Sequence, residues 1–214
     1  MIFKDREEAG QRLLPRLADL EDEANTIIVG LARGGVIVAK EVAQGLDLPL
    51  HAIIAKKLGA PGNPELAIGA IAESSGILDE KIIKEYKISR DYINVETAKL
   101  QQEITRRVKL YRKGESFLNL NGKTVVLVDD GIATGATMNS AIHYAKTAGA
   151  REVIVAVPVA SDESLQKIEK EIDRVVCIER VGPYFSAVGE HYEHFPQVSD
   201  EEVISALKSV SVKD

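Results

Sequence analysis

Five short apolar runs constrain the fold of this 214-residue chain more than any other feature. Most of their positions are apolar, with little of the alternation between apolar and polar residues that marks a half-exposed strand. Strands of this kind are covered on both faces, as in parallel sheets between layers of helices. Segments of helical character separate them, so the order strand, helix, strand recurs. The sequence therefore predicts an α/β fold with a central parallel sheet flanked by helices. The five runs are 26–31, 51–58, 123–128, 152–157 and 174–178.

The remaining segments predict a single domain over residues 1–214, because no repeat, low-complexity tract or linker interrupts the chain. Residues 6–20 have helical spacing, although Pro15 disturbs the pattern. Residues 59–65 are rich in glycine and proline, so the apolar residues 66–73 that follow form the return strand of a long hairpin. A polar helix is expected over 89–112 with Ser89 as its N-cap. A capping box at residues 199–202 opens a terminal helix.

The segment at residues 125–137 joins a buried strand to two carboxylates and a loop of small residues. Asp129 and Asp130 are expected at the carboxyl end of the strand, where parallel sheets bind ligands. Adjacent carboxylates repel each other unless donors or a cation lie beside them, and a ribose diol, alone or with Mg²⁺, supplies these. The loop leads into a helix N-terminus, which favours an anion. The segment predicts a ribose 5-phosphate site; the alternative is a solvated Asp-Asp turn before an ordinary helix.

The thirteen residues V-V-L-V-D-D-G-I-A-T-G-A-T closely resemble the phosphoribosyl pyrophosphate (PRPP) binding motif of the type I phosphoribosyltransferases. The resemblance implies the type I phosphoribosyltransferase fold. Its core would cover about 21–180, with a flap and helix insertion at 56–113. A small hood would cover about 181–214, and residues 1–20 are a candidate part of it. The resemblance also implies that Asp129 and Asp130 bind the ribose hydroxyls and Mg²⁺, directly or through water and PRPP. Gly131 departs from the motif, in which an aliphatic residue is commoner. The implied 5-phosphate loop comprises Ala133, Thr134, Gly135, Ala136 and Thr137.

Two further segments resemble the pyrophosphate end of the same family's site. L-A-R-G-G (31–35) resembles the first loop, which binds pyrophosphate through backbone amides and often contains a cis peptide, expected here between Ala32 and Arg33. The alternative is a Gly-Gly helix start with a solvated arginine. Residues 56–73 stand where the family carries a mobile flap that excludes water from an oxocarbenium-like transition state. The implied pyrophosphate ligands of the first loop are Ala32, Arg33, Gly34 and Gly35.

Basic residues near the flap are candidates for neutralising the leaving pyrophosphate. Lys56 and Lys57 are predicted catalytic residues in this sense, although a solvated strand end explains them equally well. Arg107 on the helix 89–112 is a further candidate, in this subunit or across a dimer. Its spacing from Glu103 is also that of an ion pair on a solvated helix face.

The aromatic segment at 183–195 stands where the family builds its hood over the base, and it resembles the hood of purine salvage enzymes. Tyr184 or Phe185 would stack on the base, with Val188 nearby; the alternative is that these rings pack within the protein. Ala133 stands where enzymes for hypoxanthine, guanine and xanthine carry an acid, so their proton transfer does not carry over directly. A purine acceptor is slightly favoured, and the acceptor stays open.

Charge and composition narrow the class of partner. The net charge of −6 argues against nucleic-acid binding, which needs a positive field. The apolar runs are too short to span a bilayer, and the charged start M-I-F-K-D-R-E-E is unlike a signal peptide. A cytoplasmic protein is expected, and the family resemblance implies a homodimer.

Together these features predict a Mg²⁺-dependent phosphoribosyltransferase of nucleotide salvage. It would transfer phosphoribose from PRPP to a nitrogenous base and release pyrophosphate. One alternative is a non-catalytic PRPP or nucleotide sensor of the same fold. Another is a hydrolase of phosphoribosyl or nucleoside 5′-phosphate substrates.

Overall fold

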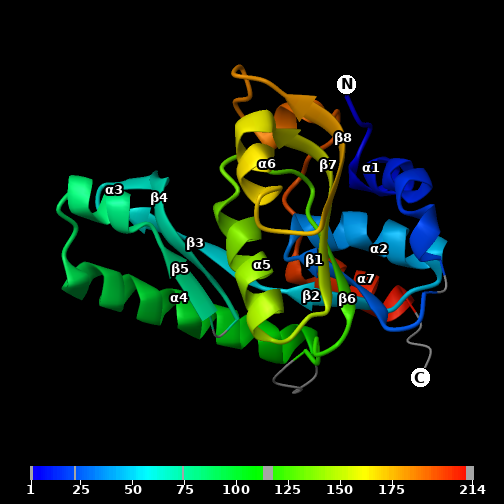
Figure 1. Cartoon of the computed structure of the whole chain (residues 1–214), viewed down its shortest axis with the longest axis horizontal. Helices are drawn as coiled ribbons and strands as arrows, with labels where there is room; N and C mark the ends of the chain where they lie inside the picture. The colour runs from blue at the N-terminus through cyan, green and yellow to red at the C-terminus, as the bar shows by residue number, and fades with distance from the viewer. Residues whose placement is uncertain (1, 22, 74, 113–117, 211–214) are drawn as a thin grey trace.

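The computed structural model describes residues 2–21, 23–73, 75–112 and 118–210 (Figure 1). At its centre is a parallel sheet with the strand order β2-β1-β6-β7-β8, which confirms the predicted architecture. The register pairs Gly30 of β1 with Val128 of β6, so the loops that follow these two strands emerge side by side. The strands are β1 (Thr26–Leu31), β2 (Leu50–Ile53), β6 (Thr124–Val128), β7 (Glu152–Ser161) and β8 (Arg174–Val181).

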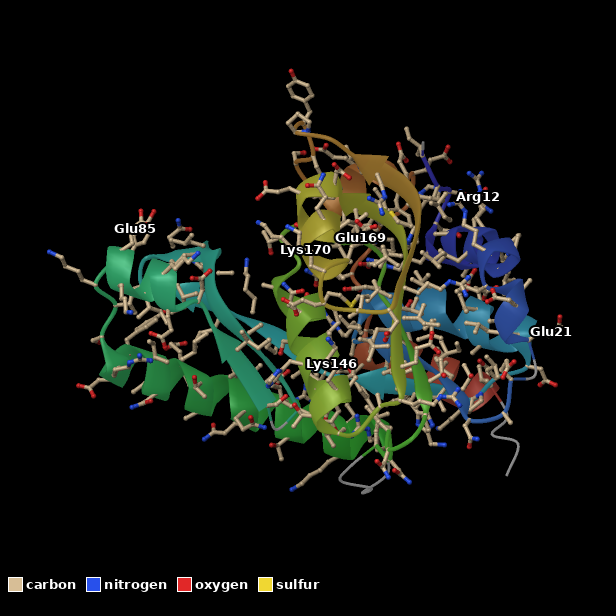
Figure 2. All side chains as sticks on the ribbon, in the orientation of Figure 1. Arg12, Glu21, Glu85, Lys146, Glu169 and Lys170 are labelled. Carbon is tan, nitrogen blue, oxygen red and sulfur yellow. The ribbon has the colours of Figure 1, made fainter. Side chains whose placement is uncertain are left out.

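Helices cover both faces of this sheet, and the apolar side chains of the strands divide between two cores. On one face, α5 (Ala136–Thr147) and α6 (Asp162–Ile168) pack on residues such as Leu127 and Val155. On the other face, α1 (Arg6–Leu13) and α2 (Gly34–Leu46) pack on residues such as Ile28 and Val126. Charged side chains such as Lys146 of α5 lie on the outside (Figure 2). Among the described residues, no helix is long and apolar enough to cross a membrane.

The predicted helix at 6–20 is shorter in the structure. The α-helix α1 ends at Leu13, and the short 3₁₀ turns η1 (Leu14–Arg16) and η2 (Ala18–Leu20) continue the chain. Pro15 lies inside η1, and its missing N–H and fixed φ explain why the α-helix does not continue. Leu13 and Leu17 are nevertheless fully buried, as the predicted apolar stripe requires.

An arm extends from one side of the core and contains the predicted hairpin (Figure 1). The predicted strand at 51–58 is divided, because the chain leaves the core sheet after β2 and enters a separate antiparallel sheet, β3-β4-β5. Leu58, Ile68, Ile83 and Ile93 belong to a small core of the arm's own. The elements of the arm are β3 (Ala55–Ala60), β4 (Asn63–Ala72), β5 (Ser75–Leu78), α3 (Glu80–Glu85) and α4 (Arg90–Tyr111), the last with the predicted N-cap Ser89.

A buried ion pair joins the base of the arm to the core sheet. Arg112, just after α4, lies 2.8 Å from the carboxylate of Glu73 at the end of β4, and the two side chains are 7% and 4% exposed. The same guanidinium donates to the carbonyl of Ala52 in β2, and Glu73 accepts from the amide of Ile54. Burial raises the pKa of Glu73, while Arg112 lowers it.

The beginning of the chain packs on the segment that follows β8. Phe3 forms a parallel bridge with Tyr192, and its amide donates to the carbonyl of His191. The turn η3 (Val188–His191) precedes this contact. The final helix α7 (Asp200–Ser209) begins with the predicted capping box of Ser199 and Glu202, and packs on α2 and α4. Residue 113 of the predicted insertion and residues 211–214 of the predicted hood lie outside the described residues.

Candidate functional site

The two unusual loops of the sequence are in direct contact. Because β1 and β6 are neighbours, the Gly-Gly sequence after β1 packs against the two carboxylates after β6. A Cβ placed on Gly34 would lie only 1.9 Å from Oδ2 of Asp130, and one on Gly35 only 2.8 Å from Oδ1 of Asp129. Only glycine permits this approach. The peptide between Ala32 and Arg33 is cis, as predicted.

The environment of the two carboxylates favours their neutral forms unless a ligand or cation is present. Burial, followed by the charge of Asp130, raises the pKa of Asp129 well above its usual range. Burial also raises the pKa of Asp130, but Arg6 opposes that effect. The backbone amide of Asp130 donates to Asp129 at 2.9 Å. The pair therefore carries a cost of ionisation that bound hydroxyl groups or a cation would lower.

Two residues that the sequence reasoning did not place at the site contact Asp130 from opposite ends of the chain. Arg6 of α1 donates from Nε to Oδ2 of Asp130 at 2.7 Å. The hydroxyl of Tyr192 donates to the backbone carbonyl of Asp130 at 2.6 Å. No local pattern signals either contact, because Arg6 lies 124 residues from its partner and the opening D-R-E-E has the composition of an ordinary helix start.

The predicted 5-phosphate loop is anchored to β7 and α6, while Ala133 and Thr134 within it are exposed. Ile132 bridges to Ala160 of β7, and the hydroxyl of Ser164 donates to the carbonyl of Ala133 at 2.6 Å. Gly135 has φ of 77° and precedes α5, which begins without a side-chain cap. The amide of Ala136 donates weakly to the Thr134 hydroxyl at 3.5 Å, and Thr137 is half-buried in the first turn. The loop thus keeps the features expected for an anion site.

A cluster of cations lies beside the Gly-Gly loop. Burial lowers the pKa of Lys56, and the nearby charges of Arg107 and Arg33 lower it further. Among the described residues, neither Lys56 nor Arg33 forms an ion pair. Lys56, Arg33 and Arg107, all predicted to act on pyrophosphate, therefore lie close enough for their charges to interact. Lys57 follows Lys56 in β3, and since neighbouring residues of a strand point to opposite faces, it does not share that side.

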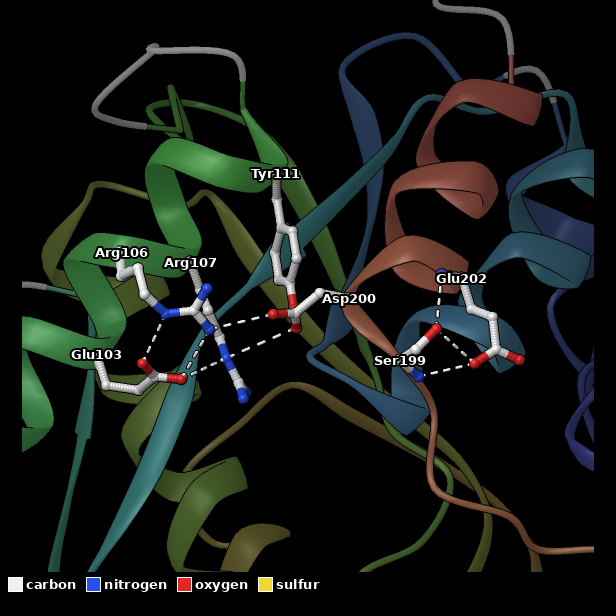
Figure 3. A network of polar contacts seen from close by, with 7 residues as sticks. All are labelled: Glu103, Arg106, Arg107, Tyr111, Ser199, Asp200 and Glu202. Atoms are coloured by element: carbon white, nitrogen blue, oxygen red, sulfur yellow. Dashed lines mark hydrogen bonds and ion pairs between the residues drawn. The ribbon is translucent and has the colours of Figure 1, made fainter.

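Arg107 also takes part in a polar network between α4 and α7 (Figure 3). Its Nε lies 2.8 Å from Glu103, the ion pair that the spacing allowed, and 3.8 Å from Asp200. The hydroxyl of Tyr111 donates to Asp200 at 2.5 Å, and this bond, with Arg106 and Arg107, lowers the pKa of Asp200. The network fixes the first turn of α7 beside the cation cluster.

The three predicted base-binding residues have different surroundings. Tyr184 is 94% exposed in the loop after β8. Phe185 stacks on His191 with ring centroids 5.5 Å apart. Val188 fills the space in front of Gly131, where an added Cβ would lie 2.6 Å from the valine side chain. Gly131 therefore replaces the commoner aliphatic residue because Val188 occupies that space, and of the three, Val188 contacts the Asp-Asp loop.

A cleft of about 680 Å³ separates the arm from the 5-phosphate loop. The arm contributes apolar side chains, including the partly exposed Ile77 and Leu78. The opposite wall contains Thr134, Ala136 and Asn139. The side-chain oxygen of Asn139 is buried and, within the described part of the chain, has no hydrogen-bond partner. Asn139 is a further polar group at the phosphate end that the sequence motif did not single out.

The carboxylates of the site suit Mg²⁺ that arrives with a phosphate ligand. Within the described ranges, no group of three or more metal-binding side chains occurs. Mg²⁺ needs no such group, since it commonly binds through one or two carboxylates, several waters and the phosphates of its substrate. Asp129 and Asp130 fit that pattern, with the second oxygen of Asp130 already engaged by Arg6.

The fold and the site define an α/β protein with a central parallel sheet, in which two neighbouring strands end in a Gly-Gly loop and an Asp-Asp loop that contact each other. The model of the family described as "Phosphoribosyl transferase domain" matches residues 4–194. The chain therefore belongs to the phosphoribosyl transferase family.

Comparison with individual proteins agrees with this family. A protein of Mycobacterium tuberculosis, provisionally described as a phosphoribosyl transferase, is 40% identical over 207 residues, which cover 96% of this chain and 46% of that protein. The chain thus spans about half the length of this relative. The crystal structure of a Thermus thermophilus protein superposes with a TM-score of 0.81 at 38% identity, covering 99% of this chain and 100% of the other. A transcriptional regulator of Methanosphaera stadtmanae is 37% identical over 67 residues, 31% of this chain and 34% of the regulator.

Proposed function

We propose that the protein is a Mg²⁺-dependent phosphoribosyltransferase that transfers phosphoribose from PRPP to a nitrogenous base. The observation that carries this proposal is the contact of Gly34 and Gly35 with Asp130 and Asp129. It sets a candidate pyrophosphate loop directly against a candidate ribose site. The anion-favouring start of α5 continues the same edge, so the order of sites matches the order of groups in PRPP.

Each residue has a defined part in the proposed reaction. The 5-phosphate binds the loop at 133–137, and the ribose hydroxyls donate to Asp129 and Asp130. The backbone of residues 32–35 and the side chain of Arg33 hold the pyrophosphate. When the bond between C1 of ribose and pyrophosphate breaks, Lys56 and Arg107 lie beside the leaving group and stabilise its charge. The base nitrogen forms the new bond to C1 and releases its proton to water.

Asp129 and Asp130 would hold Mg²⁺, which would neutralise charge on the leaving group. The cleft of about 680 Å³ beside the arm gives the substrate access from solvent, and the arm is the element that would exclude water during transfer. A purine remains the slightly favoured acceptor, with Val188 at the edge of its site and Phe185 or Tyr184 available to stack on it. A homodimer, as the family resemblance implies, would appear as twice the chain mass in light scattering after size exclusion.

Calorimetric titration with PRPP, with and without Mg²⁺, tests the proposal together with a pyrophosphate-release assay over purine and pyrimidine bases. We expect tight Mg²⁺-dependent binding and release with one acceptor. The double variant Asp129→Asn, Asp130→Asn should lose PRPP binding while its circular dichroism spectrum stays native. The matched control Asp19→Asn changes a surface carboxylate paired with Arg174 and should bind normally. PRPP binding that survives the double substitution would contradict the ribose site.

A second candidate, a PRPP or nucleotide sensor, is favoured by the 67-residue similarity to a transcriptional regulator. A sensor would bind PRPP in the same titration but release no pyrophosphate with any acceptor. Its net charge of −6 gives it no general attraction to nucleic acid. The hydrolase alternative is distinguished by its products, since it would release pyrophosphate and ribose 5-phosphate without an acceptor.

A further inference from the structure

Arg6 lies at the centre of the site although it belongs to the first helix of the chain. Its Nε donates to Oδ2 of Asp130 at 2.7 Å, and the two side chains are 9% and 15% exposed. A Cβ placed on Gly34 would lie 2.9 Å from the same Nε. The guanidinium therefore touches both the Asp-Asp loop and the Gly-Gly loop.

The orientation of Arg6 is fixed from several sides. Its Nη1 donates to the carbonyl of Pro196 at 2.8 Å. Its guanidinium carbon lies 3.8 Å from the centroid of the Phe195 ring, a favourable cation–π geometry. The helix that carries it begins at Asp5, whose side chain accepts from the amide of Glu8. A planar guanidinium held by Pro196 at Nη1 and by Phe195 on one face directs its Nε–H at one oxygen of Asp130.

We propose that Arg6 is a positioning residue, which holds the Asp130 carboxylate in the orientation that receives the ribose hydroxyls. This inference rests on the proposed function, because it assumes that Asp130 binds ribose. Arg6 engages one oxygen of this buried carboxylate, which leaves the other oxygen for the ribose hydroxyls. Arg6 should therefore affect the binding of ribose, whereas the binding of pyrophosphate should depend on Arg33 and Lys56.

The geometry separates this role from simple cross-linking of the fold. The backbone of Phe3 ties the start of the chain to the C-terminal segment through bonds with His191 and Glu193. That attachment does not depend on the side chain of Arg6. Substitution of Arg6 should therefore change ligand binding more than folding.

The test compares Arg6→Gln and Arg6→Lys with wild type by calorimetry against ribose 5-phosphate, PRPP with Mg²⁺, and pyrophosphate with Mg²⁺. A charged hydrogen bond of this kind is expected to change ribose-ligand affinity by roughly ten- to a hundredfold. We expect Arg6→Gln to weaken ribose 5-phosphate and PRPP by that factor and pyrophosphate by less than about twofold. Arg6→Lys, which keeps the charge without the fork, should give a smaller loss with the same selectivity.

Two control variants sharpen the comparison. Arg12→Gln changes an arginine on the solvent side of the same helix, paired with Glu8 and 41% exposed (Figure 2), and should bind all three ligands normally. Arg33→Ala should give the converse result, weaker pyrophosphate binding with ribose 5-phosphate spared. In an Asp130→Asn background, Arg6→Gln should have no further effect on ribose 5-phosphate, because the group that it positions is gone.

The outcomes separate the two hypotheses. If wild type binds neither PRPP nor ribose 5-phosphate, the proposed function fails and this inference fails with it. If wild type binds both and Arg6→Gln binds them equally well, only the role of Arg6 is refuted. An equal loss for all three ligands, or additive losses in the Asp130→Asn background, would show that Arg6 supports the fold alone. If Arg6→Gln does not fold, Arg6→Lys decides by the same comparison.

Discussion

The contact between Gly34 and Asp130 leaves no room for even a methyl group at position 34. A Cβ there would overlap the carboxylate oxygen at 1.9 Å, so either the loop or the acid must move. We expect Gly34→Ala to weaken PRPP binding by at least about tenfold, since misplacement of a binding group by 1 Å is costly. Calorimetry against PRPP measures the change.

A suitable control for this substitution is Gly182→Ala. Gly182 has no atom within 4 Å of an added Cβ, so the same change there should leave binding intact. If Gly34→Ala binds PRPP as tightly as Gly182→Ala, the two loops do not share one ligand.

Asp129 gives a stability prediction whose sign follows from its pKa. Burial and the charge of Asp130 raise that pKa, so the native state holds the proton more tightly than the unfolded chain. The stability contribution is complete below the unfolded pKa of ~3.9 and is lost as the pH rises through the native pKa. Asn keeps the neutral form at every pH. Asp129→Asn should therefore raise Tm at pH 7 by about 2–4 °C, the effect of ~1 kcal/mol in a domain of this size.

Thermal unfolding followed by circular dichroism from pH 4 to pH 8 checks this expectation. The difference between variant and wild type should shrink toward pH 4, where the wild-type group is neutral in the native state and about half protonated in the unfolded chain. A variant that melts below wild type at pH 7 would show that the carboxylate is stabilised in the unliganded protein.

Residues of the site could be predicted from the sequence where they lie in one short segment of the chain. Asp129, Asp130 and the loop at 133–137 follow one strand directly, and the structure places them at its carboxyl end as expected. The cis peptide after Ala32 was also predicted, from family resemblance. Arg6 was not, because the interaction that brings it to the site spans 124 residues and depends on how α1 packs. The roles of these residues in binding and transfer stay predictions.

At the scale of the elements, the stability of the arm depends on the buried ion pair of Glu73 and Arg112. Arg112→Ala would leave the Glu73 carboxylate buried without its partner, which typically costs about 3–5 kcal/mol. We expect a loss of that size in chemical denaturation, with faster hydrogen exchange in β4. The double variant Arg112→Met, Glu73→Gln removes both charges and should recover part of the loss.

Arg90→Ala is the matched control, since its partner Glu80 is exposed. It should cost less than about 1 kcal/mol. Equal effects at Arg90 and Arg112 would mean that burial of the pair at the base of the arm contributes nothing.

The arm also contains the elements that the sequence predicted least well. The hairpin and the long helix α4 were predicted from turn residues and an N-cap, and both are present. The strands β2 and β3 were predicted as one, since no residue between them signals that the chain changes sheets. The short elements β5 and α3 were missed, because β5 is defined by its pairing with β4 and the apolar residues of α3 by their packing with Ile68 and Ile93.

At the scale of the whole molecule, the first residues of the chain and the segment after β8 share one small core beside the Asp-Asp loop. Phe3 is fully buried there against Tyr192. Phe3→Ala should destabilise the protein by about 3–5 kcal/mol. It should also weaken PRPP binding, because Tyr192 and Arg6 reach Asp130 from this core.

Urea denaturation and calorimetry on the same samples measure the two effects. The control is Ile2→Ala, at a residue that is 60% exposed. It should change neither the stability nor the PRPP affinity by much. Phe3→Ala protein that is destabilised but binds PRPP normally would show that this core and the ribose site are independent.

The bond from Arg6 to Pro196 has a consequence for the synthesis of the protein. Its partners are 190 residues apart, a stretch that takes about 10–40 s to translate at ~5–20 residues per second. Once β6 has been made, it can pair with β1 while the guanidinium still lacks the carbonyl and the ring that orient it. Full affinity for a ribose ligand then requires synthesis past Pro196, and a nascent or truncated product that stops before this residue would bind a ribose ligand more weakly.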